Sequence, residues 1–323
     1  MIKNLAIIGA GLWGKNLTRN FFELNVLKCV CDLNKEELGS IKEAYPDIEI
    51  TSSFDNILTD KRIRSIVIAT PSETHYSLTK SALEAGKDVF VEKPLALSFV
   101  EAKELVDLAE QNKRILMVDH LLRYHPGIIR LKSLIGSDKL GDIKYIYSNR
   151  LNIGRLRNKE DVLWSFAPHD ISVILYLVGK MPDKINAWGG DLLEKNKHDV
   201  VLTRLHFKKD IIAHIFVNWI NPFKEQRLVV IGEKGMAVFD DLDNIKLKIY
   251  PYKIEWKNGF PTAMKSPFKP VNIDYIEPLK VACSHFIECL TKRETPLTDG
   301  RESLKVIKIL DRVKTKLDKK DWR

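Results

Sequence analysis

Two short segments of this chain contain residues whose types and spacing could bind a cofactor and catalyse a reaction. Ile7–Gly14 contains glycines in a GxGxxG arrangement after an apolar run. Such a turn lets backbone N–H groups and the positive end of a helix cradle a dinucleotide pyrophosphate. Val89–Pro94 ends in Glu92-Lys93-Pro94, which places the amine of Lys93 just after a second apolar run. A hydride carrier with an amine facing it indicates a dehydrogenase.

The elements around the glycines support a dinucleotide site. Leu5–Ile8 is a short apolar strand, Trp13–Leu24 can be helical, and Val26–Cys31 forms a second strand that ends at Asp32. This acid lies at about the 20-residue distance expected of the carboxylate that binds the adenosine ribose. A carboxylate there accepts the 2′-hydroxyl and repels a 2′-phosphate, so the sequence favours NAD over NADP.

Strands and helices keep alternating up to residue 120. Buried strands are expected at Ser65–Ala69, Val89–Val91 and Ile115–Val118. Ser72 is expected to cap a helix that ends near Gly86, and Ser98 with Glu101 forms a capping box for the next helix. This alternation predicts a parallel sheet with crossover helices, a doubly wound α/β domain of the Rossmann type over residues 1–120.

Residues 121–323 follow another pattern and are expected to form a substrate and oligomerisation domain. Successive strand-like runs from Lys184 to Tyr250, with a hairpin at Gly232–Gly235, predict an α+β fold on a largely antiparallel open sheet. The stretch 251–273 is rich in proline, lysine and glycine and is expected to be a long loop or flap. Helices are expected at Pro126–Ile135, Leu163–Gly179, Tyr275–Thr291 and about 301–317, the last one packing back on the first domain through an apolar stripe.

Composition excludes several classes of function. No stretch approaches eighteen apolar residues and the N-terminus enters a strand at once, so neither a membrane span nor a signal peptide is expected, and the location is predicted to be cytoplasmic. The four cysteines show no zinc-site spacing, so we expect reduced core thiols and no metal. The net charge of +9 owes much to the C-terminal helix, and no nucleic-acid-binding pattern is present.

In these motifs the chain resembles the Gfo/Idh/MocA oxidoreductases. The resemblance rests on Gly9–Gly14, on Ala69-Thr70-Pro71 with His75, and on Glu92-Lys93-Pro94. It covers essentially the whole chain. It implies an N-terminal NAD domain and a C-terminal domain whose open sheet commonly mediates homodimers or homotetramers.

Three further segments are similar to a nucleotide-sugar branch of that family, the UDP-N-acetylglucosamine 3-dehydrogenases, which oxidise the C3 hydroxyl of the sugar to a ketone. They are Leu121–Pro126, Leu163–Asp170 and Asn218–Pro222. Many members of the family have an aspartate four residues before the active-site histidine. This chain has Ser165 there, so a Lys–Asp–His version of the mechanism is not expected.

Oxidation of a secondary alcohol requires a base for the hydroxyl proton. Lys93 can be that base, or it can orient the hydroxyl, if partial burial lowers its pKa. His169 is the other candidate. Asp170 either orients a partner or is an early-helix acid favoured by the dipole. His75 either faces the nicotinamide or lies on the surface of its helix.

Other residues are candidates for binding. Arg155 and Arg157 either hold a substrate pyrophosphate bidentately or are solvated surface residues. The further substrate candidates are Lys93, Arg123, Tyr124, His169 and Lys224. The residues expected to contact NAD are Gly9, Gly11, Leu12, Trp13, Gly14, Asp32, Thr70, Pro71, His75, Glu92 and Lys93.

Two alternatives to a nucleotide-sugar dehydrogenase stay open at this stage. The first is a dehydrogenase of a free sugar or of a cyclitol such as inositol, which offers the arginine pair no phosphate. The second is a dinucleotide-binding sensor that has lost its chemistry.

Overall fold

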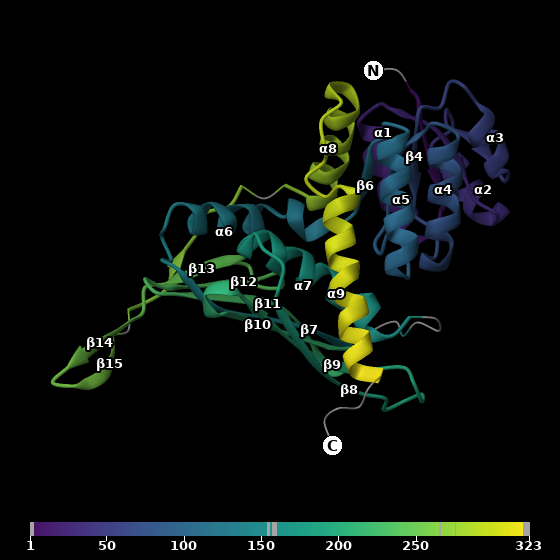
Figure 1. The fold of residues 1–323 in the computed structure, drawn as a ribbon. Helices are drawn as coiled ribbons and strands as arrows, with labels where there is room; N and C mark the ends of the chain where they lie inside the picture. The colour runs from purple at the N-terminus through teal and green to yellow at the C-terminus, as the bar shows by residue number, and fades with distance from the viewer. Residues whose placement is uncertain (1–2, 154–155, 157–159, 265, 275, 319–323) are drawn as a thin grey trace. The chain divides into compact units, whose positions relative to one another are not determined.

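The computed structural model describes residues 3–153, 156, 160–264, 266–274 and 276–318. The chain divides into two compact units (Figure 1). Unit 1 consists of Met1–Tyr124 and Glu277–Ile307, and unit 2 of His125–Ile276 and Lys308–Arg323. This division differs from the expected continuous domains 1–120 and 121–323, because a segment near the C-terminus belongs to the first unit.

Unit 1 is built on a parallel sheet in the order β3-β2-β1-β4-β5-β6. Its strands are β1 (Leu5–Ile8), β2 (Leu27–Cys31), β3 (Glu49–Thr51), β4 (Ser65–Ile68), β5 (Asp88–Val91) and β6 (Leu116–Val118). The order reverses between β1 and β4, the point at which open α/β sheets hold ligands beyond the carboxyl ends of their strands. The predicted doubly wound sheet is confirmed.

The crossovers of unit 1 are helices with short 3₁₀ turns, namely α1 (Leu12–Glu23), α2 (Lys35–Ala44), α3 (Phe54–Thr59), η1 (Ser72–Thr74), α4 (His75–Glu84), α5 (Phe99–Gln111) and η2 (Leu121–Tyr124). The Ser98 side chain accepts from the Glu101 N–H at 3.2 Å, as predicted for the cap of α5. The predicted Ser72 cap is wrong. Ser72 starts η1, whose bond from the Thr74 N–H to the Pro71 carbonyl delays the start of α4 to His75.

Helix α8 (Pro278–Lys292) belongs to unit 1 because its apolar face completes the core there. The ring of Phe286 lies 5.5 Å from that of Phe90 on β5 and 6.4 Å from that of Phe21 on α1, measured between centroids. All three side chains are fully buried. The position of α8 corrects the expectation that everything after residue 121 forms the second domain.

Unit 2 contains an eight-stranded sheet in the order β16-β13-β12-β11-β7-β10-β9-β8. Its strands are β7 (Ile143–Ile153), β8 (Lys184–Gly190), β9 (Val200–Phe207), β10 (Ile211–Asn218), β11 (Ile220–Gly232), β12 (Met236–Asp240), β13 (Leu247–Tyr250) and β16 (Lys269–Pro270). Among the described strands of this eight-stranded sheet, only the pair β10–β7 is parallel, so the predicted largely antiparallel sheet is confirmed. Helices α6 (Pro126–Gly136) and α7 (Val162–Val178) pack on one face.

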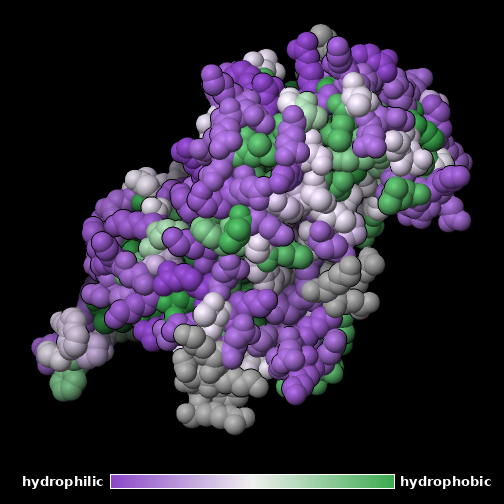
Figure 2. All heavy atoms as spheres, turned by 45° about the vertical axis from the view of Figure 1, so that its right-hand side comes forward, coloured by the Kyte–Doolittle hydropathy of each residue, from purple (hydrophilic) through white to green (hydrophobic). Residues whose placement is uncertain are grey.

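The segment 251–273, expected to be a long loop or flap, is not a simple loop. It contains a two-stranded hairpin, β14 (Lys253–Lys257) with β15 (Phe260–Met264), and the edge strand β16. Asn258 and Gly259 both have positive φ, 51° and 79°, which suits a tight hairpin turn. The hairpin projects from the sheet, and its hydrophobic tip is exposed in Figure 2, with Phe260 at 74% exposure.

Helix α9 (Gly300–Asp318) is shared, since Gly300–Ile307 counts with unit 1 and Lys308–Asp318 with unit 2. Its predicted apolar stripe is buried throughout, at Val306, Ile309, Leu310, Val313 and Leu317. In unit 2, Arg312 donates to the carbonyls of Pro182 and Asp183. The expectation that this helix packs back on the first domain therefore describes only its first part.

Candidate active site

The glycine turn between β1 and α1 uses two of its glycines for close packing. A Cβ on Gly9, whose φ is +101°, would lie 2.5 Å from the Ala69 carbonyl oxygen. A Cβ on Gly14 would lie 2.0 Å from the Gly9 carbonyl oxygen. Any side chain at either position would therefore displace the backbone.

Gly11 differs because no atom lies within 4 Å of the place where its Cβ would be. Helix α1 also has no side-chain cap and no acid in its first turn. Its first N–H groups therefore face open space that a small residue leaves accessible, as binding of a pyrophosphate requires. Leu12 and Trp13, the first residues of this helix, are 81% and 37% exposed.

Asp32 follows β2 and is held beside the glycine turn. One carboxylate oxygen accepts from the Ala10 N–H at 2.6 Å, and the other accepts from the Asn34 N–H at 2.7 Å. Each oxygen keeps a second lone pair, so the carboxylate can still accept ribose hydroxyls. The open helix terminus and the fixed acid fit the adenosine diphosphate half of NAD.

His75 connects the turns that follow β4 and β5. Its Nδ1 lies 2.7 Å from the Pro94 carbonyl oxygen and its Nε2 lies 2.9 Å from the Thr70 carbonyl oxygen. The side chain is 1% exposed, so the helix-surface alternative is wrong. His75 instead fixes the backbone next to Thr70, Pro71 and Lys93.

Lys93 is half-buried just beyond the end of β5, in a group of ionisable side chains. Asp119 and His120 follow β6, the neighbouring strand, and are 1% and 2% exposed. Burial, with Arg123 and Lys93 nearby, lowers the pKa of His120 to about 3, which keeps this imidazole neutral. Asp119 and His120 were not among the residues expected at the site, although two polar residues directly after the apolar run Ile115–Val118 indicate such a position.

Ser165, His169 and Asp170 lie in the interior of α7 rather than at its start, since the helix is capped by Asp161. Ser165 is buried and His169 half-buried, one turn apart on the same face. Asp170 accepts from the Ser148 hydroxyl at 2.5 Å and from Arg150 Nε at 2.8 Å. The early-helix explanation of Asp170 is wrong, and its contacts attach α7 to β7.

Arg123 and Tyr124 are buried within unit 1. Arg123 donates to Glu302 at 3.5 Å and to the Leu297 carbonyl at 3.3 Å. The Tyr124 hydroxyl lies 3.1 Å from that of Thr298. These contacts attach η2 to the segment before α9, and the substrate contact expected of both residues stays a prediction.

Three other residues were expected to contact the substrate. Lys224 is exposed on β11, in a stretch where the register with β7 is irregular. Arg155 and Arg157 lie outside the described residues.

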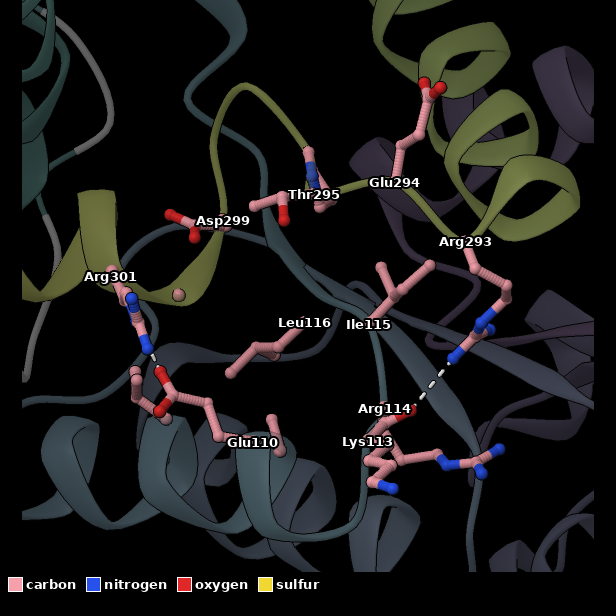
Figure 3. A pocket seen from close by; sticks show the side chains of 14 residues that line it. Glu110, Lys113, Arg114, Ile115, Leu116, Arg293, Glu294, Thr295, Asp299 and Arg301 are labelled. Carbon is pink, nitrogen blue, oxygen red and sulfur yellow. Dashed lines mark hydrogen bonds and ion pairs between the residues drawn. The ribbon is translucent and has the colours of Figure 1, made fainter.

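Unit 1 also contains a pocket of about 430 Å³ (Figure 3). Ile115 and Leu116 line it, so it lies at the amino end of β6, whereas the glycine turn and Lys93 lie at the carboxyl ends of the strands. Two of its arginines are engaged, since Arg301 donates to Glu110 at 2.5 Å and Arg293 to the Lys113 carbonyl at 2.9 Å. This pocket is not the dinucleotide site.

Two absences apply to the described part of the chain. No helix there is long and apolar enough to cross a membrane. No group of three or more His, Cys, Asp or Glu side chains there is arranged to hold a metal ion. The four cysteines are buried and unbridged, at positions 29, 31, 283 and 289.

The chain belongs to the Gfo/Idh/MocA oxidoreductase family. Residues 3–120 match the family described as "Oxidoreductase family, NAD-binding Rossmann fold", and residues 128–238 match the "GFO/IDH/MocA C-terminal domain". The protein is therefore an NAD-dependent oxidoreductase, as the glycine turn and Asp32 predicted.

The sequence identity to individual relatives is low. The chain is 25% identical to the UDP-N-acetylglucosamine 3-dehydrogenase of Acidithiobacillus ferrooxidans, over 76% of this chain and 75% of that protein. It is also 25% identical to the 2,7-anhydro-N-acetylneuraminate hydratase of Mediterraneibacter gnavus, over 74% of this chain and 67% of that protein. The solved structure of the Acidithiobacillus dehydrogenase GnnA has a TM-score of 0.86 at 22% identity, covering 98% of this chain and 97% of its own. At that identity the structural likeness concerns the fold.

Proposed function

We propose that this protein oxidises a hydroxyl group of a nucleotide sugar with NAD, and that the substrate is UDP-N-acetylglucosamine, oxidised at C3. The observation that supports this most is the place of Lys93, half-buried at the carboxyl end of β5 in the sheet whose β1 turn fits NAD. The 25% identity to a UDP-N-acetylglucosamine 3-dehydrogenase supports the substrate class.

The bound nicotinamide supplies the hydride acceptor. In the proposed reaction Lys93 takes the proton of the substrate hydroxyl, or holds that hydroxyl in place for removal of the proton. His169 on α7 is the second candidate for this role. Lys224, with Arg155 and Arg157, is proposed to bind the nucleotide part of the substrate.

The experiment is incubation of protein and NAD with a panel of nucleotide sugars, free sugars and inositol, with absorbance of NADH as the readout. We expect NADH with UDP-N-acetylglucosamine and none with inositol, and Lys93→Met serves as the blank. NADH with inositol or a free sugar would favour the cyclitol alternative. A new product without net NADH would indicate a redox-neutral reaction in place of net oxidation. NAD binding without any product would favour a sensor.

The arginine pair provides a more specific prediction. Arg155→Ala and Arg157→Ala should raise the KM for a UDP-sugar and leave NAD affinity nearly unchanged, because the substrate pyrophosphate does not itself react. Steady-state kinetics and NAD titration measure the two effects. Arg62→Ala, at a 68%-exposed side chain in unit 1, is a matched surface control. Wild-type KM values in both variants would contradict a phosphate-binding role.

We also propose that the open sheet of unit 2 joins copies of this chain into a homodimer or homotetramer. Trp188 on β8 and Leu202 on β9 are opposite each other in the register and are 42% and 37% exposed. Sedimentation of wild type and Trp188→Glu tests this, since a charge in the interface should favour the monomer. The cytoplasmic location stays a prediction.

A further inference from the structure

Glu92 and Asp119 occupy equivalent places at the ends of neighbouring strands. Val91 of β5 pairs with Val118 of β6 in parallel register, so each acid is the next residue on its strand. The Asp119 N–H donates to the Val91 carbonyl at 2.9 Å, and the Glu92 N–H donates to the Ile68 carbonyl at 2.9 Å. Both backbones are therefore held by the sheet, and the two carboxyl groups lie beside Lys93.

Three oxygens of this pair are buried without a hydrogen-bond partner among the described residues. They are both carboxyl oxygens of Asp119 and Oε1 of Glu92. A buried ionised carboxylate that lacks partners costs several kcal/mol of solvation free energy, and two adjacent ones also repel. The arrangement disfavours two negative charges and favours a proton held between them.

The pKa values of both acids are shifted in the direction that favours a shared proton. Burial raises the pKa of Asp119 to about 6. Burial, followed by the charge of Asp119, raises the pKa of Glu92 well above its ordinary value. The neighbouring Glu92 carboxyl opposes the rise for Asp119 most, and the positive charge of Lys93 opposes the rise for both acids.

Three other titratable side chains of the described residues lie near the pair, and none of them is a base at neutral pH. His120 is neutral, and the pKa of Tyr124 on η2 is raised by burial. The pKa of Cys283 on α8 is raised by burial and by the two carboxyl groups themselves. A pair of coupled carboxyl groups in such surroundings titrates as a unit.

We propose that Glu92 and Asp119 form a one-proton carboxyl pair that receives the proton of the substrate hydroxyl from Lys93. The inference rests on the function proposed above for Lys93. Both acids act through Lys93, so they are positioning residues rather than catalytic ones.

The step balances without any further reactant. The C–H and O–H bonds of the alcohol break and a C=O bond forms. A bound NAD would take up the hydride, and the proton passes to Nζ of Lys93. Nζ then gives a proton to the singly charged pair, which becomes neutral and later releases that proton to solvent.

The first test measures protonation and needs no substrate. Infrared spectra of the NAD-bound protein at about pH 8 should contain a carbonyl-stretching band of a protonated carboxylic acid, which ordinary Asp and Glu lack at that pH. The band should be lost or shifted in Asp119→Asn and in Glu92→Gln, and unchanged in Glu84→Gln, an exposed acid on α4. Absence of the band in wild type, or the same band in both pair variants, would overturn the proposal.

The second test is a pH profile of kcat under saturating NAD. The pair cannot accept a proton once it is fully protonated, so wild-type oxidation should decline as pH falls through about 6. Asp119→Asn should lower kcat by roughly 10²-fold near pH 8 and move the midpoint of this decline. A lower kcat with an unmoved midpoint would indicate only a structural role and would contradict the proposal.

Failure of this inference can be distinguished from failure of the proposed function. If no sugar yields NADH, the proposed function fails while the infrared test still decides whether the pair holds a proton. If NADH forms but the band and the midpoint are unaffected, the function stands and the carboxyl pair is excluded. Glu92→Gln repeats both measurements should Asp119→Asn not fold.

Discussion

The glycine turn and the ends of β5 and β6 lie at the same edge of one sheet but are built differently. The turn places backbone at the ligand: Gly9 and Gly14 allow close packing, and Gly11 leaves the terminus of α1 open. The strand ends instead place ionisable side chains, and several of these have buried polar atoms that lack a hydrogen-bond partner among the described residues. A backbone site has fixed partial charges, whereas the properties of a side-chain site depend on protonation. We therefore expect substitutions in the turn to change binding and those at the strand ends to change turnover and its pH dependence.

The largest effect should come from Lys93. Lys93→Met should lower kcat by about 10²–10⁴-fold or more, because general-base contributions have this size. NAD binding should stay measurable, since the glycine turn is untouched. Single-turnover formation of NADH and NAD titration measure the two properties separately.

His169 and Ser165 serve as comparisons for that result. His169→Ala should also slow turnover, and the relative losses identify the residue that takes the proton. Ser165→Ala should cost less than either, because a hydroxyl cannot replace a carboxylate in relaying charge. A loss of turnover in Ser165→Ala as large as that in Lys93→Met would contradict the roles assigned to these residues.

A smaller effect is expected at Asp32. Asp32→Ala should weaken NAD binding by roughly 1.5–3 kcal/mol and leave NADP binding much less affected, because only NAD gains from a carboxylate at the 2′-hydroxyl. Titration of both cofactors measures the difference. Equal losses for the two would mean that Asp32 only holds the turn through its bonds to Ala10 and Asn34.

The smallest expected effect is a difference in stability between alanine substitutions at two glycines of the turn. Gly14→Ala should lower the free energy of unfolding by roughly 1–3 kcal/mol, since its Cβ meets the Gly9 carbonyl. Gly11→Ala should cost less than about 1 kcal/mol and still weaken NAD binding. Denaturant unfolding and NAD titration compare the variants, and Gly39→Ala, at another glycine with open space around its Cβ, is the control. Equal destabilisation at the two turn positions would mean that Gly11 has a packing role.

The sequence determined the elements that depend on local pattern. The glycine turn, the Ser98 cap, the turn at Gly232–Gly235 and the apolar stripe of α9 all follow from residue spacing over a few turns. The Asn258-Gly259 turn was equally local, but the proline and lysine content around it obscured the hairpin. Hydrogen-bonding geometry along the chain is enough to specify such features.

Only the tertiary structure decided which distant residues meet. Helix α8 joins unit 1 because Phe286 packs against Phe21 and Phe90, and no local pattern encodes that partner. The sequence left two explanations of Asp170 open. In the structure Asp170 accepts hydrogen bonds from Ser148 and Arg150 on β7. The pairing of β5 with β6 places Asp119 beside Glu92. Burial, which shifts the pKa of both acids, is a property of the packed sheet and not of either residue's neighbours in sequence.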